Sequence, residues 1–432
     1  YRNQKEMVDM IQCAIDDGKK VKIHKIAEKY MNVNVYEDLN IAKELMKEDN
    51  PRVLIVHNQM KYYGGGELLI VELANWLTKR GIKNDILALS KSKEVEDKLI
   101  NTSIIIPSHD VDLNPPGYKN ITDILNAIKV FRKKLKEIKD NYDVINFHDF
   151  PVTWSLWPRK KPAVWFMNLP PSLFSKPDAG FFLKMLHKGR VWLDRLIVRQ
   201  SMDIITVAED LNMLRAKQRY GINARMVYFG TDYDFFSKGN AQKANKKYNL
   251  EKKFIIIQSG VICNVKNQFE SVKAIARIKE KIPNVLLILA GRWEEDYKKK
   301  IEAYVKEAGL EKNILFTGNL KREELRDLYK VADVGLFPLG EQGGVLAPIE
   351  VLCAGTPVIV SEDAETAPLV KGEELGIVTK NYAKAILEVK DNQTEWKKKT
   401  KKAGNFIKKN LSWEAYSDRM IRAFKDAWKR YK

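Results

Sequence analysis

Residues 338–360 read PLGEQGGVLAPIEVLCAGTPVIV and carry the local signals of a loop, a helix and a strand in that order. Gly343 and Gly344 predict a flexible loop after an apolar run. Pro348 suits the first turn of a helix, where a missing N–H leaves no hydrogen bond unmade. The β-branched run Val358–Val360 then predicts a buried strand. A strand, a loop, a helix and a further strand form the repeating unit of a parallel α/β sheet.

The same alternation of apolar runs and amphipathic stretches extends on both sides of this segment, from Arg52 onward. Such runs are typical of strands that are buried on both faces of a parallel, doubly wound sheet. A charged stretch, Lys238–Lys253, divides the runs into two series, which predicts two sheets. The first series comprises Val53–His57, Asp85–Leu89, Ile104–Pro107, Val144–Phe147, Ala163–Met167, Ile204–Val207 and Met226–Phe229. The second comprises Phe254–Gln258, Val285–Ala290, Ile314–Thr317, Val334–Phe337, Val358–Val360 and Ile377–Thr379.

We therefore predict an α/β fold with two doubly wound, Rossmann-like domains that face each other across a cleft. Residues 1–49 show helical patterns without a β-rich run and are expected to form an N-terminal helical extension. The first domain is predicted at residues 50–237, the second at 238–412, and a C-terminal helix at 413–432. Ligands of such sheets bind beyond the carboxyl ends of the strands, so the residues that follow each run are the candidates for a site.

The composition is that of an ordinary folded protein, with 45% hydrophobic and 30% charged residues among 432. No apolar run approaches the ~18 residues that a membrane-spanning helix requires. The three cysteines, Cys13, Cys263 and Cys353, are far apart and form no CxxC pair. This pattern favours a reducing cytoplasm and argues against cysteine-bound zinc.

The charge is unusual, because 75 Lys and Arg residues against 56 Asp and Glu residues give a net charge of +19. Residues 390–432 alone carry fourteen basic and five acidic side chains. A phosphorylated substrate, an anionic membrane surface and a nucleic acid are all compatible with such a field. Lysines that only solvate helix faces are the alternative.

The first strand is followed by Gly64-Gly65-Gly66-Glu67, which opens a predicted helix at Leu68–Lys79. Glycines let a ligand approach the backbone closely, and the unpaired N–H groups of a helix start attract anions. The turn matches neither the dinucleotide motif GxGxxG nor the phosphate loop GxxxxGKS/T, so those two interpretations lose their main support. A plain tight turn is the structural alternative.

Two further candidates follow other predicted strands. His148 comes after Val144–Phe147, where an imidazole would lie at the working edge of the sheet, and a histidine buried in the core is the alternative. In the second sheet, Lys266 comes after Gly260 and can neutralise a phosphate as a point charge.

The glycine loop of the opening segment leads into a helix start. Free N–H groups at Val345 and Leu346, next to Gly344, are available to a phosphate. Glu350, one turn further on, can accept hydrogen bonds from vicinal hydroxyls such as those of a ribose. A metal-dependent enzyme is a separate hypothesis, in which a divalent cation on a diphosphate is held by one of two Asp-x-Asp triplets. These triplets are Asp110/Asp112 and Asp232/Asp234.

Together these residues resemble the retaining, nucleotide-sugar-dependent glycosyltransferases of the GT-B fold, often called family four. The matching segments span residues 51–430. They are the GGGE turn, the strand ending in His148, Val227–Asp232, Gly318, Phe337-Pro338 and, as the most specific part, EQGGVLAPIEVLCAGTPVIV. The resemblance implies that the N-terminal sheet binds the acceptor and the C-terminal sheet binds a nucleoside-diphosphate sugar, with no metal and no other cofactor. It also implies that the C-terminal helix packs back on the first domain.

The resemblance assigns roles to single positions. The expected catalytic residues are His148 and either Glu341 or Gln342. The family pairs two glutamates with seven residues between them; counted back from Glu350, that spacing reaches Gln342, whereas Glu341 is one position early. The expected donor-binding residues are Gly65, Gly66, Gly260, Lys266, Arg292, Gly344, Val345, Leu346 and Glu350.

Two departures from the family pattern concern the donor. The arginine that the family places after its glycine, ahead of the diphosphate lysine, is Val261 here, so Arg292 would have to replace it. The usual Pro-Glu pair is also absent around Ala367-Pro368. These changes leave open a reduced or altered activity.

The sequence thus predicts transfer of a sugar from a nucleoside-diphosphate sugar to an acceptor, with retention of configuration and without a metal. The acceptor is unknown, and a lipid-linked or phosphate-bearing molecule would suit the positive charge. The aromatic and basic stretch Phe181–Trp192 suits an anionic membrane surface, and a helix packed on the first sheet is the alternative. We expect a cytoplasmic protein, peripheral on the inner face of a membrane if this stretch binds lipid, and no nucleic-acid partner. The alternative function is a catalytically weak or inactive protein of the same fold that binds an anionic polymer through its basic surface.

Overall fold

The computed structural model describes residues 16–18, 50–107, 121–158, 161–171, 181–340 and 346–431, without the side chains of 181–183. It separates into two units, Tyr1–Asn50 and Pro51–Lys432. The expected helical extension at residues 1–49 lies almost entirely outside the described residues. Both sheets lie within the second unit.

The first sheet contains seven parallel strands in the order β3-β2-β1-β4-β5-β6-β7. Their bounds are β1 (Val53–Val56), β2 (Asn84–Leu87), β3 (Ile104–Ile105), β4 (Val144–Phe147), β5 (Ala163–Phe166), β6 (Ile204–Val207) and β7 (Arg225–Met226). Strand β1 pairs on both sides, with Ile55 opposite Ile86 of β2 and Asn146 of β4. The chain runs outward to β3 before it returns to β4, so the strand order reverses between β1 and β4.

The second sheet contains six parallel strands in the order β10-β9-β8-β11-β12-β13. Their bounds are β8 (Phe254–Ser259), β9 (Val285–Ala290), β10 (Ile314–Gly318), β11 (Val334–Phe337), β12 (Val358–Val360) and β13 (Ile377–Val378). Its strand order reverses between β8 and β11. Two doubly wound parallel sheets confirm the predicted fold class, and the two reversals mark the places where such sheets bind ligands.

Both faces of each sheet are buried. In β1, Val53 and Ile55 enter one hydrophobic core, whereas Leu54 and Val56 enter another. The helices of the first half are α3 (Gly65–Lys79), α4 (Lys93–Glu96), α5 (Ile121–Ile138), α6 (Phe181–Ser201), α7 (Asp210–Tyr220) and α8 (Tyr233–Phe236). Those of the second half are α9 (Ala241–Tyr248), α10 (Gln268–Ile278), α11 (Glu295–Glu307), α12 (Arg322–Val331), α13 (Leu346–Cys353), α14 (Ala367–Gly372), α15 (Tyr382–Asp391), α16 (Gln393–Asn410) and α17 (Trp413–Lys429). Short 3₁₀ turns occur at η1 (Lys139–Asn141), η2 (Val152–Trp154) and η3 (Asn264–Lys266).

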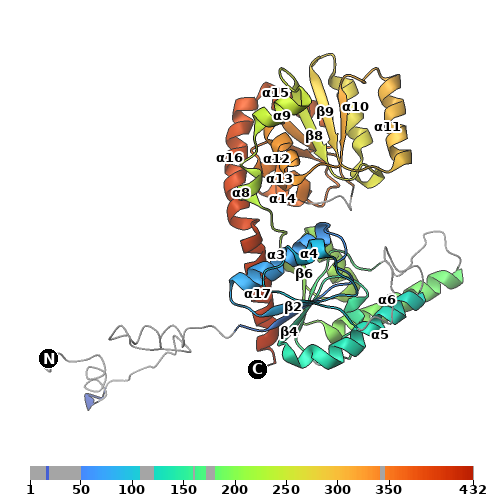
Figure 1. Ribbon diagram of the computed structural model, residues 1–432, viewed down its shortest axis with the longest axis vertical. Coiled ribbons are helices and arrows are strands. Elements are labelled where there is room, and N and C mark those ends of the chain that lie inside the picture. Colours follow the sequence, from blue (N-terminus) through green and yellow to red (C-terminus); the bar gives the residue numbers. More distant parts are fainter. Residues whose placement is uncertain are drawn as a thin grey trace. The chain divides into compact units, whose positions relative to one another are not determined.

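The last helix, α17, packs on the first sheet although it follows the second sheet in the chain (Figure 1). Its side chains Tyr416, Met420 and Phe424 are fully buried in the core that also holds α3 and β1. Helix α16 instead packs against α13 and α15 of the second half. The Thr231 N–H donates to the Leu411 carbonyl at 2.7 Å, so the two places where the chain passes between the halves are hydrogen-bonded to each other.

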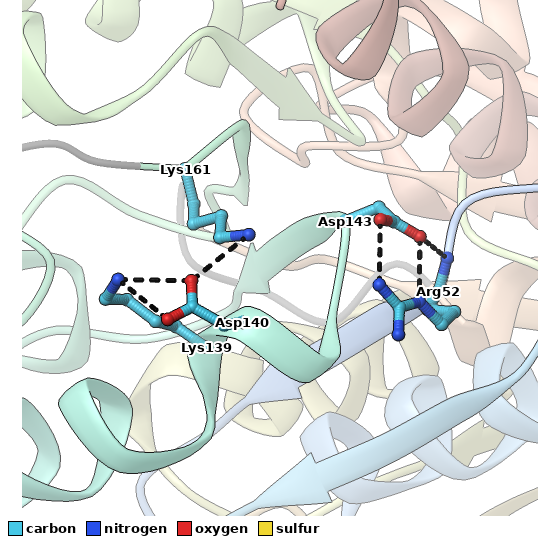
Figure 2. A network of polar contacts seen from close by, with 5 residues as sticks. All are labelled: Arg52, Lys139, Asp140, Asp143 and Lys161. Carbon is cyan, nitrogen blue, oxygen red and sulfur yellow. Dashed lines mark hydrogen bonds and ion pairs between the residues drawn. The ribbon is translucent and has the colours of Figure 1, made fainter.

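An ion pair joins the amino ends of β1 and β4 (Figure 2). The backbone N–H and Nε of Arg52 donate to Oδ2 of Asp143 at 2.8 and 3.1 Å, and Nη2 donates to Oδ1 at 3.1 Å. The same view shows Asp140 between Lys139 and Lys161. Such solvent-accessible pairs stabilise a fold only weakly. The carboxyl ends of β1 and β4, where a ligand is expected, lie at the opposite edge of the sheet.

Candidate functional site

A cavity of about 330 Å³ is lined by residues from both halves of the chain. The first half contributes Gly65, Gly66, Leu69, Asn168, Leu169, Glu209 and Phe229. The second half contributes Ser259, Gly260, Lys266, Phe337, Leu339, Leu346, Ala347 and Glu365. Asn168, Glu209 and Gly260 follow β5, β6 and β8 within two residues. The cavity therefore lies at the carboxyl ends of the strands, where a doubly wound fold binds its ligand.

Lys266 is positioned by its backbone. It ends η3, and its carbonyl accepts a hydrogen bond from Nε2 of Gln258 at 2.7 Å. Among the described residues, no hydrogen bond or ion pair holds its ammonium group. Burial lowers the pKa of this group. A partly desolvated ammonium group on a cavity wall is available to an anionic ligand.

The backbone at Gly260 requires glycine at two positions. Gly260 has a φ of +130°, and Gly291 has a φ of +149°. A Cβ atom on Gly291 would lie 2.0 Å from the Gly260 carbonyl oxygen, so a side chain there would displace the cavity wall. Arg292, expected to replace the family's arginine, is exposed and does not line the cavity. Its carbonyl accepts a hydrogen bond from the Ile262 N–H at 2.8 Å.

Two helix starts border the cavity. Gly65 and Gly66 begin α3, and the Gly64 N–H just before them donates to Oε2 of Glu67 at 3.1 Å. Leu346 is the first described residue of α13 and also lines the cavity. The unpaired N–H groups of a helix start attract anions. The expected site residues Glu341, Gln342, Gly344 and Val345 lie outside the described residues.

Glu350 lies on α13 but does not line the cavity. Its Oε2 accepts a hydrogen bond from Oη of Tyr329 at 3.3 Å, and this Oη lies 2.6 Å from Oγ of Ser259. Burial raises the pKa of Glu350 to about 7. Because Ser259 lines the cavity, Glu350 is connected to it through two hydrogen bonds.

His148 is buried next to the carboxyl end of β4, and it does not line the cavity. Its Nε2 lies 2.9 Å from Oδ1 of Asn146, and its ring stacks on Phe166 with the centroids 5.5 Å apart. Burial and the neighbouring His57 lower the pKa of His148 to about 3. The imidazole is therefore neutral near pH 7.

A second histidine, His57, is also buried; the sequence pattern predicts it only as the last residue of a strand. Its Nδ1 lies 2.9 Å from Oδ2 of Asp149, and its Nε2 lies 3.9 Å from Oε1 of Glu67. Burial alone would lower its pKa, but these two carboxylates outweigh that effect and raise the pKa to about 9. His57 follows β1 as His148 follows β4, and their ring centroids are 6.3 Å apart. The position directly after a strand, which singled out His148 in the sequence, could therefore have identified His57 as a site residue as well.

An acidic pair on the cavity wall, Glu209 and Glu365, was not predicted from the sequence. Burial and the charge of Glu365 raise the pKa of Glu209 to about 8. Arg215 lies 3.8 Å from Glu365. Glu209 comes two residues after β6, so its position after a strand was a usable signal. The electrostatic interaction of Glu209 with Glu365, which is 156 positions later in the chain, could not be predicted from the local sequence pattern.

One of the two Asp-x-Asp triplets has structural partners. Oδ1 of Asp232 accepts the Phe235 N–H at the start of α8, and Oδ2 lies 3.5 Å from Arg322. Asp234 pairs with Lys408 at 3.2 Å. Asp110 and Asp112 lie outside the described residues. Within the described part of the chain, no group of three His, Cys, Asp or Glu side chains is arranged to hold a metal ion.

Two family models match the chain, one for each sheet. The Glycosyltransferase Family 4 model matches residues 63–235, and the Glycosyl transferases group 1 model matches residues 240–409. Together with the two doubly wound sheets and the cavity, these matches define a glycosyltransferase of the GT-B fold. The chain belongs to the group 1 glycosyltransferases.

Relatives and solved structures agree with this assignment. The D-inositol 3-phosphate glycosyltransferase of Thermobifida fusca (strain YX) is 22% identical over 391 residues, which are 84% of this chain and 89% of the relative. The alpha-galactosylglucosyldiacylglycerol synthase of Streptococcus pneumoniae (strain ATCC BAA-255 / R6) is 22% identical over 375 residues, 81% of this chain and 93% of the relative. The crystal structure of Anabaena HepE in complex with UDP and glucose matches with a TM-score of 0.67 at 14% identity, over 87% of this chain and 100% of that one. None of the described helices combines the length and the apolar character needed to cross a bilayer.

Proposed function

We propose that this glycosyltransferase moves a sugar from a nucleoside-diphosphate sugar to an acceptor, with retention of configuration and without a metal ion. The observation that carries the proposal is the cavity, where the Lys266 ammonium group and the starts of α3 and α13 come together. These groups supply the positive charge and the N–H donors that a diphosphate requires.

The chemistry needs such groups at the leaving phosphate. When the bond between the sugar and the diphosphate breaks, negative charge grows on the β-phosphate. Donors that are already in place stabilise this charge, and each is worth roughly 3–4 kcal/mol in a site that excludes water. We place the diphosphate between Lys266 and Leu346. Glu350, which the sequence assigned to the ribose, does not line the cavity and acts on it through Tyr329 and Ser259. A UDP-hexose is the first donor to test, because the structurally similar HepE was crystallised with UDP and glucose.

Nucleotide binding tests the proposal directly. The unsubstituted chain should gain thermal stability with a UDP- or GDP-sugar, because a ligand that binds only the folded state raises the melting temperature. Lys266→Ala should weaken nucleotide binding in calorimetry by about 1.5–3 kcal/mol, the usual value of a hydrogen bond to a charged group. Lys299→Ala on α11 is the matched control, because Lys299 is exposed and far from the lining residues in sequence. Equal affinity of the Lys266 and Lys299 variants would contradict the placement of the diphosphate.

We further propose that the acceptor is presented at an anionic membrane surface, on the side of α6. This helix exposes large apolar side chains at Met185, Leu186, Trp192 and Leu193. It also carries the basic residues Lys184, Lys188, Arg190, Arg195 and Arg199. The buried Asp194 anchors α6, because it accepts hydrogen bonds from Trp154, Arg219 and Tyr220. A helix with exposed aromatic and basic side chains is attracted to anionic lipid, and one relative is by name a synthase of a diacylglycerol glycolipid.

Vesicle binding tests this second proposal. The protein should co-sediment with phosphatidylcholine vesicles that contain phosphatidylglycerol, and less with phosphatidylcholine alone. Trp192→Ala removes a side chain that is 65% exposed and should reduce this binding. Leu214→Ala on α7 removes one that is 60% exposed and should leave it unchanged. Binding that does not distinguish anionic from neutral vesicles at low salt would leave a water-soluble acceptor.

A further inference from the structure

Ser259 connects the cavity to the interior of the second half. It is the last residue of β8, and it lines the cavity together with Gly260 and Lys266. The residue is 6% exposed, and its Oγ lies 2.6 Å from Oη of Tyr329, a side chain that is fully buried on α12. What this tyrosine does with its proton therefore decides what the serine can offer to a ligand.

The hydroxyl of Tyr329 has one proton and two oxygen neighbours. Its Oη donates to Oε2 of Glu350 at 3.3 Å and lies 2.6 Å from Oγ of Ser259. An ionised carboxylate cannot donate, and two oxygen atoms without a proton between them repel each other, so the tyrosine proton lies toward Glu350. The proton between Tyr329 and Ser259 then comes from the serine. Ser259 thus donates into the protein and keeps only its lone pairs for the cavity.

The direction of these hydrogen bonds depends on the charge of Glu350. Burial raises the pKa of Glu350 to about 7, while Arg322 on α12 favours the ionised form and Asp232, which caps α8, opposes it. Burial and the charge of Glu350 raise the pKa of Tyr329 far above its ordinary value, so the tyrosine keeps its proton. At about pH 8, one unit above the pKa of Glu350, most molecules therefore have the serine as donor to the tyrosine.

An oxygen atom that can only accept is complemented by a ligand group that donates. Among the described residues, Oγ of Ser259 has Tyr329 as its single hydrogen-bond partner, so its remaining lone pairs are available. In a nucleoside-diphosphate sugar, the hydroxyl groups of the ribose and of the sugar donate hydrogen bonds, whereas ionised phosphate oxygens only accept them. Lys266 on the same wall suits the phosphates, and Ser259 suits a hydroxyl group.

We infer that Ser259 contacts the nucleotide sugar and accepts a hydrogen bond from one of its hydroxyl groups, and that Tyr329 and Glu350 are positioning residues that keep the serine in this accepting state. This inference rests on the proposed function. It gives Glu350 an effect on hydroxyl recognition although its carboxylate does not line the cavity. The hydroxyl group belongs either to the ribose or to the transferred sugar, and binding measurements distinguish these two sources.

Calorimetry at about pH 8 tests the contact. The ligands are UDP or GDP, whichever raises the melting temperature more, its 2′-deoxy and 3′-deoxy forms, and the matching UDP-glucose or GDP-mannose. Ser259→Ala should weaken binding of the nucleotide sugar about fivefold, the usual effect of one neutral hydrogen bond. With a ribose hydroxyl as the source, the bare nucleotide loses the same factor and one deoxy form loses none; with a sugar hydroxyl, the bare nucleotide is unaffected. Ser103→Ala is the control and should change no affinity, because Ser103 is exposed and precedes β3 at the opposite edge of the first sheet.

A double-mutant cycle tests the positioning residues. Tyr329→Phe keeps the buried ring but leaves the serine proton without its acceptor, and it should weaken binding of the nucleotide sugar about threefold. Adding Tyr329→Phe to Ser259→Ala should cause no further loss, because the tyrosine acts on the ligand through the serine. Glu350→Gln retains an acceptor for the tyrosine proton and should stay within about twofold of the unsubstituted chain, whereas Glu350→Ala should resemble Tyr329→Phe.

Three results would overturn the inference and leave the proposed function standing. The first is unchanged affinity of Ser259→Ala for every ligand. The second is an equal loss for the bare nucleotide and both of its deoxy forms, because Ser259 would then contact a phosphate. The third is an additive cycle, in which Tyr329→Phe lowers the affinity by the same factor with and without Ser259, as expected of a tyrosine that only supports the fold. Absence of binding by every ligand to the unsubstituted chain would overturn the proposed function as well.

Discussion

Raising the pH above neutrality should destabilise this protein through His57. Its pKa is about 9 in the folded chain against an ordinary value of 6.5, so between these values the folded chain holds a proton that the unfolded chain releases. The stabilisation is fully present below pH 6.5 and is lost as the pH rises through 9. Each pKa unit is worth about 1.36 kcal/mol. Because the partner Asp149 is 36% exposed, we discount the full amount to about 1–3 kcal/mol.

Urea unfolding followed by tryptophan fluorescence measures this effect. The free energy of unfolding should fall by about 1–3 kcal/mol more for the unsubstituted chain than for His57→Gln between about pH 6.5 and about pH 9.5. Glutamine keeps a hydrogen-bond donor near Asp149 and Glu67 but cannot titrate. The lysines and tyrosines that also titrate at high pH are common to both proteins, so they cancel in the comparison. Parallel losses in the two proteins would refute the assignment of the raised pKa to His57.

Three further outcomes are expected. His148→Ala should lower turnover more than nucleotide affinity, as expected for a group that acts near the sugar; equal losses would indicate a role in folding. Gly230→Ala should cost at least about 2 kcal/mol of stability, because a Cβ atom there would lie 2.3 Å from Cε3 of Trp413, whereas Gly189→Ala has free space and should be tolerated in the same thermal melt. Turnover should survive an excess of chelator, and a loss that Mg²⁺ or Mn²⁺ restores would contradict the metal-free mechanism.

The central strands were predictable from the sequence because they are buried on both faces, whereas the edge strands β7, β10 and β13 are only half-buried. All thirteen lie within three residues of their expected bounds. The largest difference is in β7, expected at Met226–Phe229 and found at Arg225–Met226. The residues after it are apolar for another reason: Val227 is fully buried in the core around α17, although it lies beyond the strand. An apolar run in the sequence indicates that its residues are buried. It does not show which of those residues form hydrogen bonds with a neighbouring strand.

Only part of the candidate site could be predicted from the sequence. Gly65, Gly66, Gly260, Lys266 and Leu346 line the cavity, as expected from their places after strands and at helix starts. The acidic pair was not predicted because it forms only when segments from both sheets meet. The charge state of the two histidines was also hidden from the sequence. It depends on which carboxylates reach each ring, and this is fixed by tertiary packing.

Because α17 packs on the first sheet, the two halves differ in whether each could be produced as one continuous fragment. The second half is one continuous stretch of chain between Thr231 and Leu411, whereas the first half is complete only with Trp413–Lys429. During synthesis, the apolar surface of the first half that Tyr416 and Phe424 cover therefore stays exposed to solvent until the entire second half has been made. A fragment that ends before α17 would expose this apolar surface and aggregate, but the second half could be excised whole. Supplying α17 as a separate peptide offers a direct way to complete the isolated first half.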